Sequence, residues 1–323
     1  MTRAQALRIT RQLSNIPSSI RGLSAVNEKV IWFSGSKGYV GFTTDGGISW
    51  TYGQVKEFEA MDFRSLYAFD AKRALIANAG SPAYILKTVD GGKTWNPVYQ
   101  NSHAEMFLDG MDFWDDKTGL IYGDPIGSRM MILKTTNGGN TWSEIGINQR
   151  PELQNGEASF AASGTGIRCF SKNEVVISTG GIVSRLWYSS DQGEHWVPRS
   201  VPINQGKNTT GIFSVGITKN RWIVVGGDYQ IDSLADQHVL YSNTGKIWKA
   251  PVYPTKGYRS SVEFITGKTW IALGQDGIDF SIDDGLNWIP GPDEKGFHVV
   301  RRSRKGTKIL AAGKGKVSII EIK

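Results

Sequence analysis

The sequence predicts an all-β fold, a seven-bladed β-propeller made of four-stranded antiparallel blades. The first observation is an eight-residue turn, written in full at Thr88-Val89-Asp90-Gly91-Gly92-Lys93-Thr94-Trp95, that recurs along the chain. The second is the alternation of apolar and polar residues in short runs separated by Gly, Asn and Asp clusters, which is typical of strands joined by tight turns. The third is that no stretch of ten or more residues has a convincing helical pattern.

The repeated turn occurs six times. Its closing tryptophans are spaced by 45, 47, 54, 52 and 40 residues, and a self-similar period of about 40–50 residues indicates a repeat architecture. The polar third residue and the closing tryptophan of five copies are Asp45 and Trp50, Asp90 and Trp95, Asn137 and Trp142, Asp191 and Trp196, and Asp283 and Trp288. The remaining copy ends at Trp248 and has lost both the Asp and one position.

The residue types in this turn have a structural explanation. Short Thr, Ser and Asp side chains accept hydrogen bonds from nearby backbone N–H groups and stabilise a tight turn. The glycines allow positive φ, and the indole ring offers a large apolar surface to bury. We therefore interpret the Asp and Trp positions as structural, and we expect each turn to join the third and fourth strands of a blade.

The turns set the blade count. Six blades follow at about residues 20–55, 60–100, 108–147, 165–200, 210–253 and 258–290. Three further strands remain near the C-terminus without a fourth partner, and the run from Ala6 to Thr10 is a free strand. Pairing the N-terminal strand with the last of the three C-terminal strands removes an exposed edge. This gives a seventh blade of residues 296–323 plus 5–14, and the whole chain, residues 1–323, is then a single domain. A six-bladed propeller is the alternative.

Loop lengths distinguish the two faces of the predicted propeller. The long segments, residues 101–109, 123–129, 148–164, 180–185 and 228–237, all link blades or join second and third strands. These links share one face, which we call the long-loop face, and the other face carries only short turns. Because elaborated loops on a rigid scaffold commonly carry function, we place the binding site on the long-loop face.

Arginines recur near the start of the predicted innermost strands. They are Arg21, Arg64, Arg168, Arg259 and Arg301. We hypothesise that they converge on the central channel, with Asp124 and Arg129 on a nearby long loop, and that they bind a protein or peptide of acidic character, or a glycan, since guanidinium groups bind carboxylates in bidentate fashion. The alternative interpretation is that each arginine pairs with a local carboxylate and supports the channel wall.

Enzymatic interpretations have less support. No Tyr, Glu and Asp set of a sialidase can be assigned, and Arg8-Ile9-Thr10 lacks the proline of the sialidase Arg-Ile-Pro signature. A glycosidase needs two acids across a cleft, and the long loops offer candidate acids at Glu105, Asp109, Asp124, Glu152, Glu157, Asp228 and Asp232. The combination of His103, Glu105 and Asp109 is a weak metal signal without paired spacing. We expect neither a metal nor a cofactor.

Composition adds further bounds. The formal net charge is +7, but no nucleic-acid reading module is visible, and the only dense basic run is Arg301-Arg302-Ser303-Arg304-Lys305. The single cysteine, Cys169, excludes an internal disulfide, and we expect it in the core. The sequence contains no stretch of 18 apolar residues, so it predicts no transmembrane helix. The start of the chain lacks the apolar core of a signal peptide, and we expect a monomer.

The turns match the Asp-box (BNR repeat) consensus Ser/Thr-x-Asp-x-Gly-x-Thr/Ser-Trp. Beyond the turns, the chain resembles the photosystem II stability/assembly factor family, in the pattern from Met111-Asp112-Phe113-Trp114 to Gly123 that leads to Ile132 and the turn ending at Trp142. The resemblance implies a binding or assembly scaffold rather than an enzyme, an arginine patch for an acidic or C-terminal peptide, and an extracytoplasmic location. A carbohydrate-active hydrolase remains the alternative function.

Overall fold

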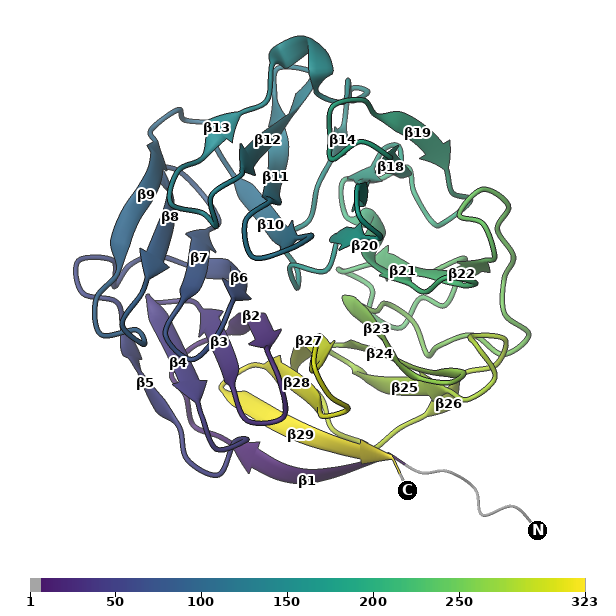
Figure 1. The fold of residues 1–323 in the computed structure, drawn as a ribbon. Coiled ribbons are helices and arrows are strands. Elements are labelled where there is room, and N and C mark those ends of the chain that lie inside the picture. Colours follow the sequence, from purple (N-terminus) through teal and green to yellow (C-terminus); the bar gives the residue numbers. More distant parts are fainter. Residues whose placement is uncertain (1–6, 323) are drawn as a thin grey trace.

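Seven antiparallel sheets stand radially around a central channel (Figure 1). The computed structural model describes residues 7–322; residues 1–6 and 323, which the predicted domain and its last blade include, lie outside this part. The prediction of a seven-bladed propeller is confirmed, and the six-bladed alternative is wrong. The only helical element described is a single 3-10 turn, η1 (Ile147–Gln149).

Each of the first three blades has four consecutive strands. Blade 1 contains β2 (Ile20–Ala25), β3 (Ile31–Gly35), β4 (Tyr39–Thr43) and β5 (Thr51–Gln54). Blade 2 contains β6 (Phe63–Ala68), β7 (Ala74–Asn78), β8 (Ala83–Thr88) and β9 (Asn96–Asn101). Blade 3 contains β10 (Leu108–Phe113), β11 (Gly119–Ile126), β12 (Arg129–Thr135) and β13 (Ser143–Glu144).

Blades 4 and 5 are joined through two short added strands. Blade 4 contains β15 (Ile167–Phe170), β16 (Glu174–Ser178), β18 (Arg185–Ser189) and β19 (Val197–Ser200). Blade 5 contains β20 (Thr210–Ile217), β21 (Trp222–Asp228) and β22 (Val239–Ser242), and its fourth strand is reduced to one bridge between Tyr241 and Lys249. Two long loops extend its inner edge as β14 (Glu157–Ala158) and β17 (Gly180–Gly181), giving the order β14-β17-β20-β21-β22.

Blades 6 and 7 complete the ring. Blade 6 contains β23 (Ser261–Thr266), β24 (Thr269–Gly274), β25 (Gly277–Ser281) and β26 (Ile289–Pro290). Blade 7 contains β27 (Phe297–Arg302), β28 (Ile309–Gly313), β29 (Lys316–Ile322) and, from the other end of the chain, β1 (Leu7–Leu13). β1 pairs antiparallel with β29 from Leu7 opposite Ile322 to Leu13 opposite Val317. The predicted closure of the last blade by the N-terminal strand is confirmed.

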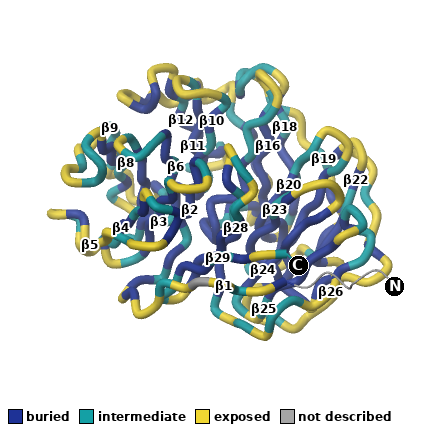
Figure 2. The backbone as a smooth tube through the Cα atoms, turned by 60° about the horizontal axis from the view of Figure 1, so that its bottom comes forward, coloured by how far each residue is buried: buried dark blue, intermediate teal, exposed yellow. Residues whose placement is uncertain are grey.

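The core lies between adjacent blades, since clusters of buried apolar side chains each join two neighbouring sheets. Figure 2 shows that the strands are mostly buried and the connecting turns mostly exposed. All five residues of β3 and all five of β7 are buried. Aromatic residues bridge neighbouring blades: the Trp95 ring of blade 2 meets the Trp32 ring of blade 1 edge-on, with centroids 6.2 Å apart. Such inter-blade contacts fix each sheet against the next.

The repeated turns join the third and fourth strands, as the sequence analysis expects. In the blade 2 copy, the Thr88 hydroxyl donates to Asp90 Oδ1 at 2.9 Å and accepts from the Gly92 N–H. Asp90 also accepts from the N–H and the hydroxyl of Thr94. Gly91 and Gly92 have φ of 79° and 78°, in the left-handed region that disfavours other residues.

Three substituted copies keep a side-chain contact between the third and seventh residues of the turn. Asn137 donates through Nδ2 to the Thr141 hydroxyl at 2.9 Å. His195 Nδ1 lies 2.7 Å from Asp191 Oδ2, and Asn287 Nδ2 donates to Asp283. In these three copies the substitution therefore exchanges one polar group for another and the contact remains.

Candidate binding site in the central channel

The innermost strand of each blade presents residues to the channel at two levels. The upper level, toward the long-loop face, is set by a bulge in the pairing of the first two strands of a blade. The residues at this bulge are Arg21, Arg64, Asp109, Phe213 and His298. The lower level lies three residues further along each strand, toward the short turns, and contains Ser24, Tyr67, Asp112, Arg168, Gly216, Glu263 and Arg301.

At the upper level, Arg21 and Arg64 come from neighbouring blades. Arg21 Nη1 donates to the carbonyl oxygen of Ala162 at 2.8 Å, and this is its only hydrogen bond within residues 7–322. Burial and the positive charge of Arg64 lower the pKa of Arg21. Arg64 Nε pairs with Asp62 at 2.7 Å, and both side chains are about one-third exposed. This end of the channel therefore holds a cation without a carboxylate of its own.

His298 of blade 7 completes the upper level on the other side of Arg21. Burial and the charges of Arg21, Lys314 and Arg64 lower its pKa to about 2. The ring is therefore neutral at physiological pH, with Nε2 lying 3.1 Å from the Ser19 hydroxyl. Burial is the larger cause of this shift, and the three neighbouring cations add to it.

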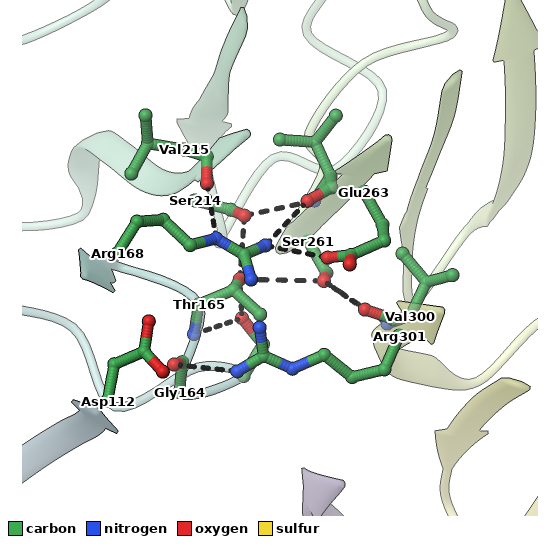
Figure 3. Close-up of polar contacts among 12 residues, drawn as sticks. Asp112, Gly164, Thr165, Arg168, Ser214, Val215, Ser261, Glu263, Val300 and Arg301 are labelled. Carbon is green, nitrogen blue, oxygen red and sulfur yellow. Dashed lines mark hydrogen bonds and ion pairs between the residues drawn. The ribbon is translucent and has the colours of Figure 1, made fainter. Parts of the chain in front are cut away.

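At the lower level, Arg168 and Arg301 point into the channel from β15 and β27 (Figure 3). Arg168 has a carboxylate partner: Nη2 pairs with Glu263 at 2.8 Å, and Nε donates to the Val215 carbonyl oxygen at 2.8 Å. Arg301 has a single hydrogen bond, from Nη2 to the Gly164 carbonyl oxygen at 3.1 Å. No carboxylate of the described residues lies within ion-pair distance of it. Burial and the charge of Arg168 lower the pKa of Arg301 to about 10.

Arg259 lies away from the channel. It lies two residues before β23, at the position where other blades place the buried side chains of Ile20, Phe63 and Phe297. Its side chain is 1% exposed and pairs with Asp279, with Nε donating to Oδ2 at 2.7 Å. A shift of one residue along the strand thus turns this arginine into the blade. The five arginines do not form one cluster: two lie at each level of the channel, and Arg259 is outside it.

Asp124 and Arg129 both contact the long insertion of residues 148–164. Asp124 Oδ1 accepts from the Ser159 N–H at 3.0 Å, and burial raises the pKa of Asp124. Arg129 pairs with Glu152 at 3.0 Å. The structure does not bring either residue together with the channel arginines.

A seven-residue stretch at the end of this insertion, residues 159–165, fills the centre of the ring; we call it the channel segment. Ala162 and Gly164 accept hydrogen bonds from Arg21 and Arg301, as described above. Ser163 donates to the Ser260 carbonyl oxygen at 2.7 Å, and Thr165 donates to the Ser214 hydroxyl at 2.6 Å. Gly164 has φ of 63°, which lets the chain turn within the channel. The channel segment thus separates the upper level from the lower level.

A short strand just before the channel segment is held by Glu157. Its side chain is fully buried and accepts hydrogen bonds from Thr179 and Trp187 while pairing with Arg185. The neighbouring loops enclose a cavity of about 550 Å³ on the long-loop face. Its lining includes Pro125, Ser128, Asn155, Gly181 and Asn208.

The candidate acids are mostly engaged or inaccessible. Asp109 is fully buried and neither carboxyl oxygen has a partner among the described residues; burial and nearby Asp124 raise its pKa well above the usual range. A substrate in solvent cannot reach such a group. No group of three or more His, Cys, Asp or Glu residues within residues 7–322 is arranged to hold a metal ion.

Sequence reasoning missed the role of the basic run that follows Arg301. Arg304 reaches across the short-turn face, where Nη1 donates to the Ser24 hydroxyl at 2.9 Å and the guanidinium lies 4.4 Å from the Tyr67 ring centroid. The density of charge in this run was the available signal. Cys169, expected in the core, is instead half-buried beside these residues, and burial raises the pKa of its thiol.

Comparison with known proteins bears on the fold. No family model matches the sequence, and a search of curated proteins finds no match. Among solved structures, the chain is similar to YCF48 bound to D1 peptide, with a TM-score of 0.68, 14% identity, and coverage of 96% of this chain and 94% of that chain. It is similar to YCF48 from Cyanidioschyzon merolae, with a TM-score of 0.64, 15% identity, and coverage of 97% and 98%.

The fold also resembles that of an enzyme. A GH74 xyloglucanase from Xanthomonas campestris has a TM-score of 0.64 and 12% identity, over 96% of this chain and 52% of that chain. At these identities the similarities establish the fold alone. Propellers of this shape serve both binding and catalysis, so the side chains of the channel and loops must decide between them. The described residues contain no helix with the length and apolarity needed to cross a membrane.

Proposed function

We propose that this protein is a non-enzymatic binding scaffold that holds an acidic segment of a protein or peptide on its long-loop face. The observation that carries the proposal is Arg21, a cation that has no carboxylate partner among residues 7–322 and lies beside a second arginine, Arg64. Guanidinium groups form strong charge-assisted hydrogen bonds with carboxylates. An acidic side chain or chain end would relieve the repulsion between the two arginines.

The surroundings favour a macromolecular ligand. The long loops that border the channel expose large apolar side chains: Ile182 is 45% exposed, Tyr229 43% and Ile231 45%. Exposed apolar side chains next to a charged recognition group are typical of protein interaction surfaces. The rigid ring of sheets beneath them would hold the loops in place, which reduces the entropy lost on binding.

The similarity to YCF48 bound to D1 peptide supports the same proposal, because it shows that a propeller of this shape can hold a peptide. The hydrogen bonding of the repeated turns supports their assignment as Asp boxes. A hydrolase has less support. Of its candidate acids on the long-loop face, Asp109 is sealed from solvent and Glu157 is fully buried in bonds to Arg185, Trp187 and Thr179.

The test uses a fluorescent peptide of alternating Asp and Ala residues with a free C-terminal carboxylate. Binding is measured by fluorescence anisotropy for the natural protein and for the double variant Arg21→Gln/Arg64→Gln. Glutamine removes the positive charge and keeps a polar side chain with N–H donors at each position. We expect at least a tenfold rise in Kd, about 1.4 kcal/mol or more of binding energy, and weaker binding as salt is added.

The matched control is Lys117→Gln/Lys219→Gln, which removes the same charge from exposed positions in the short turns. It should leave the Kd unchanged. Equal loss in both double variants would show that the peptide responds only to net charge, and an unchanged Kd in a well-folded Arg21→Gln/Arg64→Gln variant would overturn the proposal.

A further inference from the structure

We propose a second anion site at the opposite end of the channel, in which Arg301 binds a single oxyanion group such as phosphate, sulfate or a carboxylate. The site opens toward the short turns rather than the long loops. It does not rest on the proposed function, because the channel segment lies between this site and the pair of Arg21 and Arg64.

A cavity of about 200 Å³ occupies this end of the channel. Its charged lining consists of Arg168, Arg301, Arg302, Arg304, Asp112 and Glu263, four arginines against two carboxylates. The cavity therefore carries an excess of positive charge. Since one water molecule takes up about 30 Å³ in the liquid, a group of four or five heavy atoms fits.

The neighbouring arginines are already engaged. Arg168 pairs with Glu263 and donates to two carbonyl oxygens. Arg302 donates to the Ile265 carbonyl oxygen, and Arg304 donates to the Ser24 hydroxyl and the Ala68 carbonyl oxygen. These bonds hold the guanidinium groups of Arg168, Arg302 and Arg304 in place around the cavity. Their positive charges raise the local electrostatic potential, but few of their N–H groups are free to bind a ligand.

Arg301 differs from these three. Only one of its five N–H groups has a partner within residues 7–322, the Gly164 carbonyl oxygen. Asp112 is near enough to interact electrostatically with Arg301. Its two carboxylate oxygens, however, accept hydrogen bonds from the Cys169 N–H at 2.9 Å and the Phe113 N–H at 3.0 Å. Figure 3 shows the two side chains on either side of Gly164 with no bond between them.

An unpaired arginine in such a place is costly unless an anion joins it. A partly desolvated charge without a partner destabilises a fold, and here the charge of Arg168 adds to the cost. An oxyanion in the cavity would accept hydrogen bonds from the free edge of the guanidinium, in the geometry that suits carboxylate and phosphate. The remaining arginines would balance its charge.

The experiment measures thermal unfolding of the full chain while inorganic phosphate is added to 10 mM at constant ionic strength. Parallel series use sulfate and acetate. We expect phosphate to raise the unfolding midpoint of the natural protein by roughly 3–6 °C, because a ligand that binds only the folded state stabilises it. The variant Arg301→Met should lose this rise. Calorimetric titration of phosphate provides the same comparison without heating.

Three further measurements separate a binding role from a structural one. Lys305→Gln removes one exposed charge from the same turn without touching the cavity, and it should respond to phosphate as the natural protein does. Arg21→Gln/Arg64→Gln should also respond in full, which keeps this test distinct from that of the proposed function. Without added anion, Arg301→Met should melt at or above the temperature of the natural protein.

The comparison of anions identifies the source of the group. A response to phosphate and sulfate alone indicates a tetrahedral anion, and an equal response to acetate indicates a carboxylate such as a chain end presents; both support the site. The absence of a response to all three anions would overturn it. A lower melting temperature of Arg301→Met in anion-free buffer, with an unchanged response to phosphate, would overturn it as well and assign Arg301 to holding Gly164.

Discussion

Arg259 and Asp279 form an ion pair in which each side chain is only 1% exposed. Both charged groups are buried, and the attraction between them offsets the large free-energy cost of removing them from water. The pair joins Arg259, two residues before β23, to Asp279 in β25, and so ties the start of the inner strand of blade 6 to the third strand.

Replacing Asp279 with Ala should strongly destabilise the protein, since Arg259 would remain charged and buried. Breaking a buried pair of this kind costs about 3–5 kcal/mol, which urea denaturation would show as a lower midpoint. The double variant Arg259→Met/Asp279→Leu provides the control: it removes both charges and should recover most of the loss. If the double variant is no more stable than Asp279→Ala, the cost comes from packing and not from charge.

The repeated turns should respond to acid. The hydrogen bonds from the hydroxyl and N–H of Thr94 lower the pKa of Asp90 to about 2, below an unfolded value of about 3.9. The stabilisation from this carboxylate is therefore complete above pH 4 and is lost as the pH falls toward 2. In Asp90→Asn, which mimics the natural turn at Asn137, the difference in melting temperature from the natural protein should shrink over this range. A constant difference would contradict the assignment, and Asp90→Ala should melt lower throughout.

Removal of β1 should open the ring. A chain that begins after Leu13 leaves the outer edge of β29 without its partner strand, and unpaired edges favour association with other chains. We expect a lower melting temperature and higher-order species in size-exclusion chromatography with light scattering. A chain that lacks only residues 1–6 keeps β1 and serves as the control. Monomeric, equally stable behaviour of both truncations would argue against closure as a stabilising device.

Glu157 should be required for order in the long insertion. Glu157→Ala would leave Arg185 without its carboxylate partner, and the side chain of Arg185 is only 14% exposed. Loss of one member of such a pair costs about 3–5 kcal/mol, and limited proteolysis should then cut within residues 148–164 first. Glu152→Ala, on an exposed partner of Arg129, should have little effect. Cleavage that begins elsewhere would show that other contacts hold the insertion.

The sequence was sufficient for the architecture because the information is local. Each repeated turn contains its own acceptors and donors, and the apolar residues Leu7 and Ile9 alternate with polar ones at the start of the N-terminal strand. The candidate site was harder to predict, since a channel residue is defined by the bulge in its strand. Arg21 and Arg259 both look like arginines at the start of an inner strand, but a difference of one position along the strand places Arg21 in the channel and Arg259 inside the blade.

The channel segment could not be predicted at all. Residues 159–165 are a short run of small residues around Phe160, without an alternating pattern, and nothing local distinguishes them from a solvated loop. Their place depends on acceptors and donors more than 90 residues away, such as Arg21, Ser260 and Arg301. The expectation of one arginine cluster failed for the same reason, because the chain that divides the arginines into two levels is itself without a local signal.

The central position of this short stretch has a consequence for how the molecule folds. Repeat proteins commonly gain stability from nearest neighbours and can form one unit at a time. Here the chain between blades 3 and 4 bonds to side chains or carbonyl groups of blades 1, 5, 6 and 7. The middle of the ring can therefore close only after distant parts of the chain have met, and we expect such long-range contacts to slow folding and to increase its cooperativity. The channel segment would therefore couple the stability of the blades it contacts to one another.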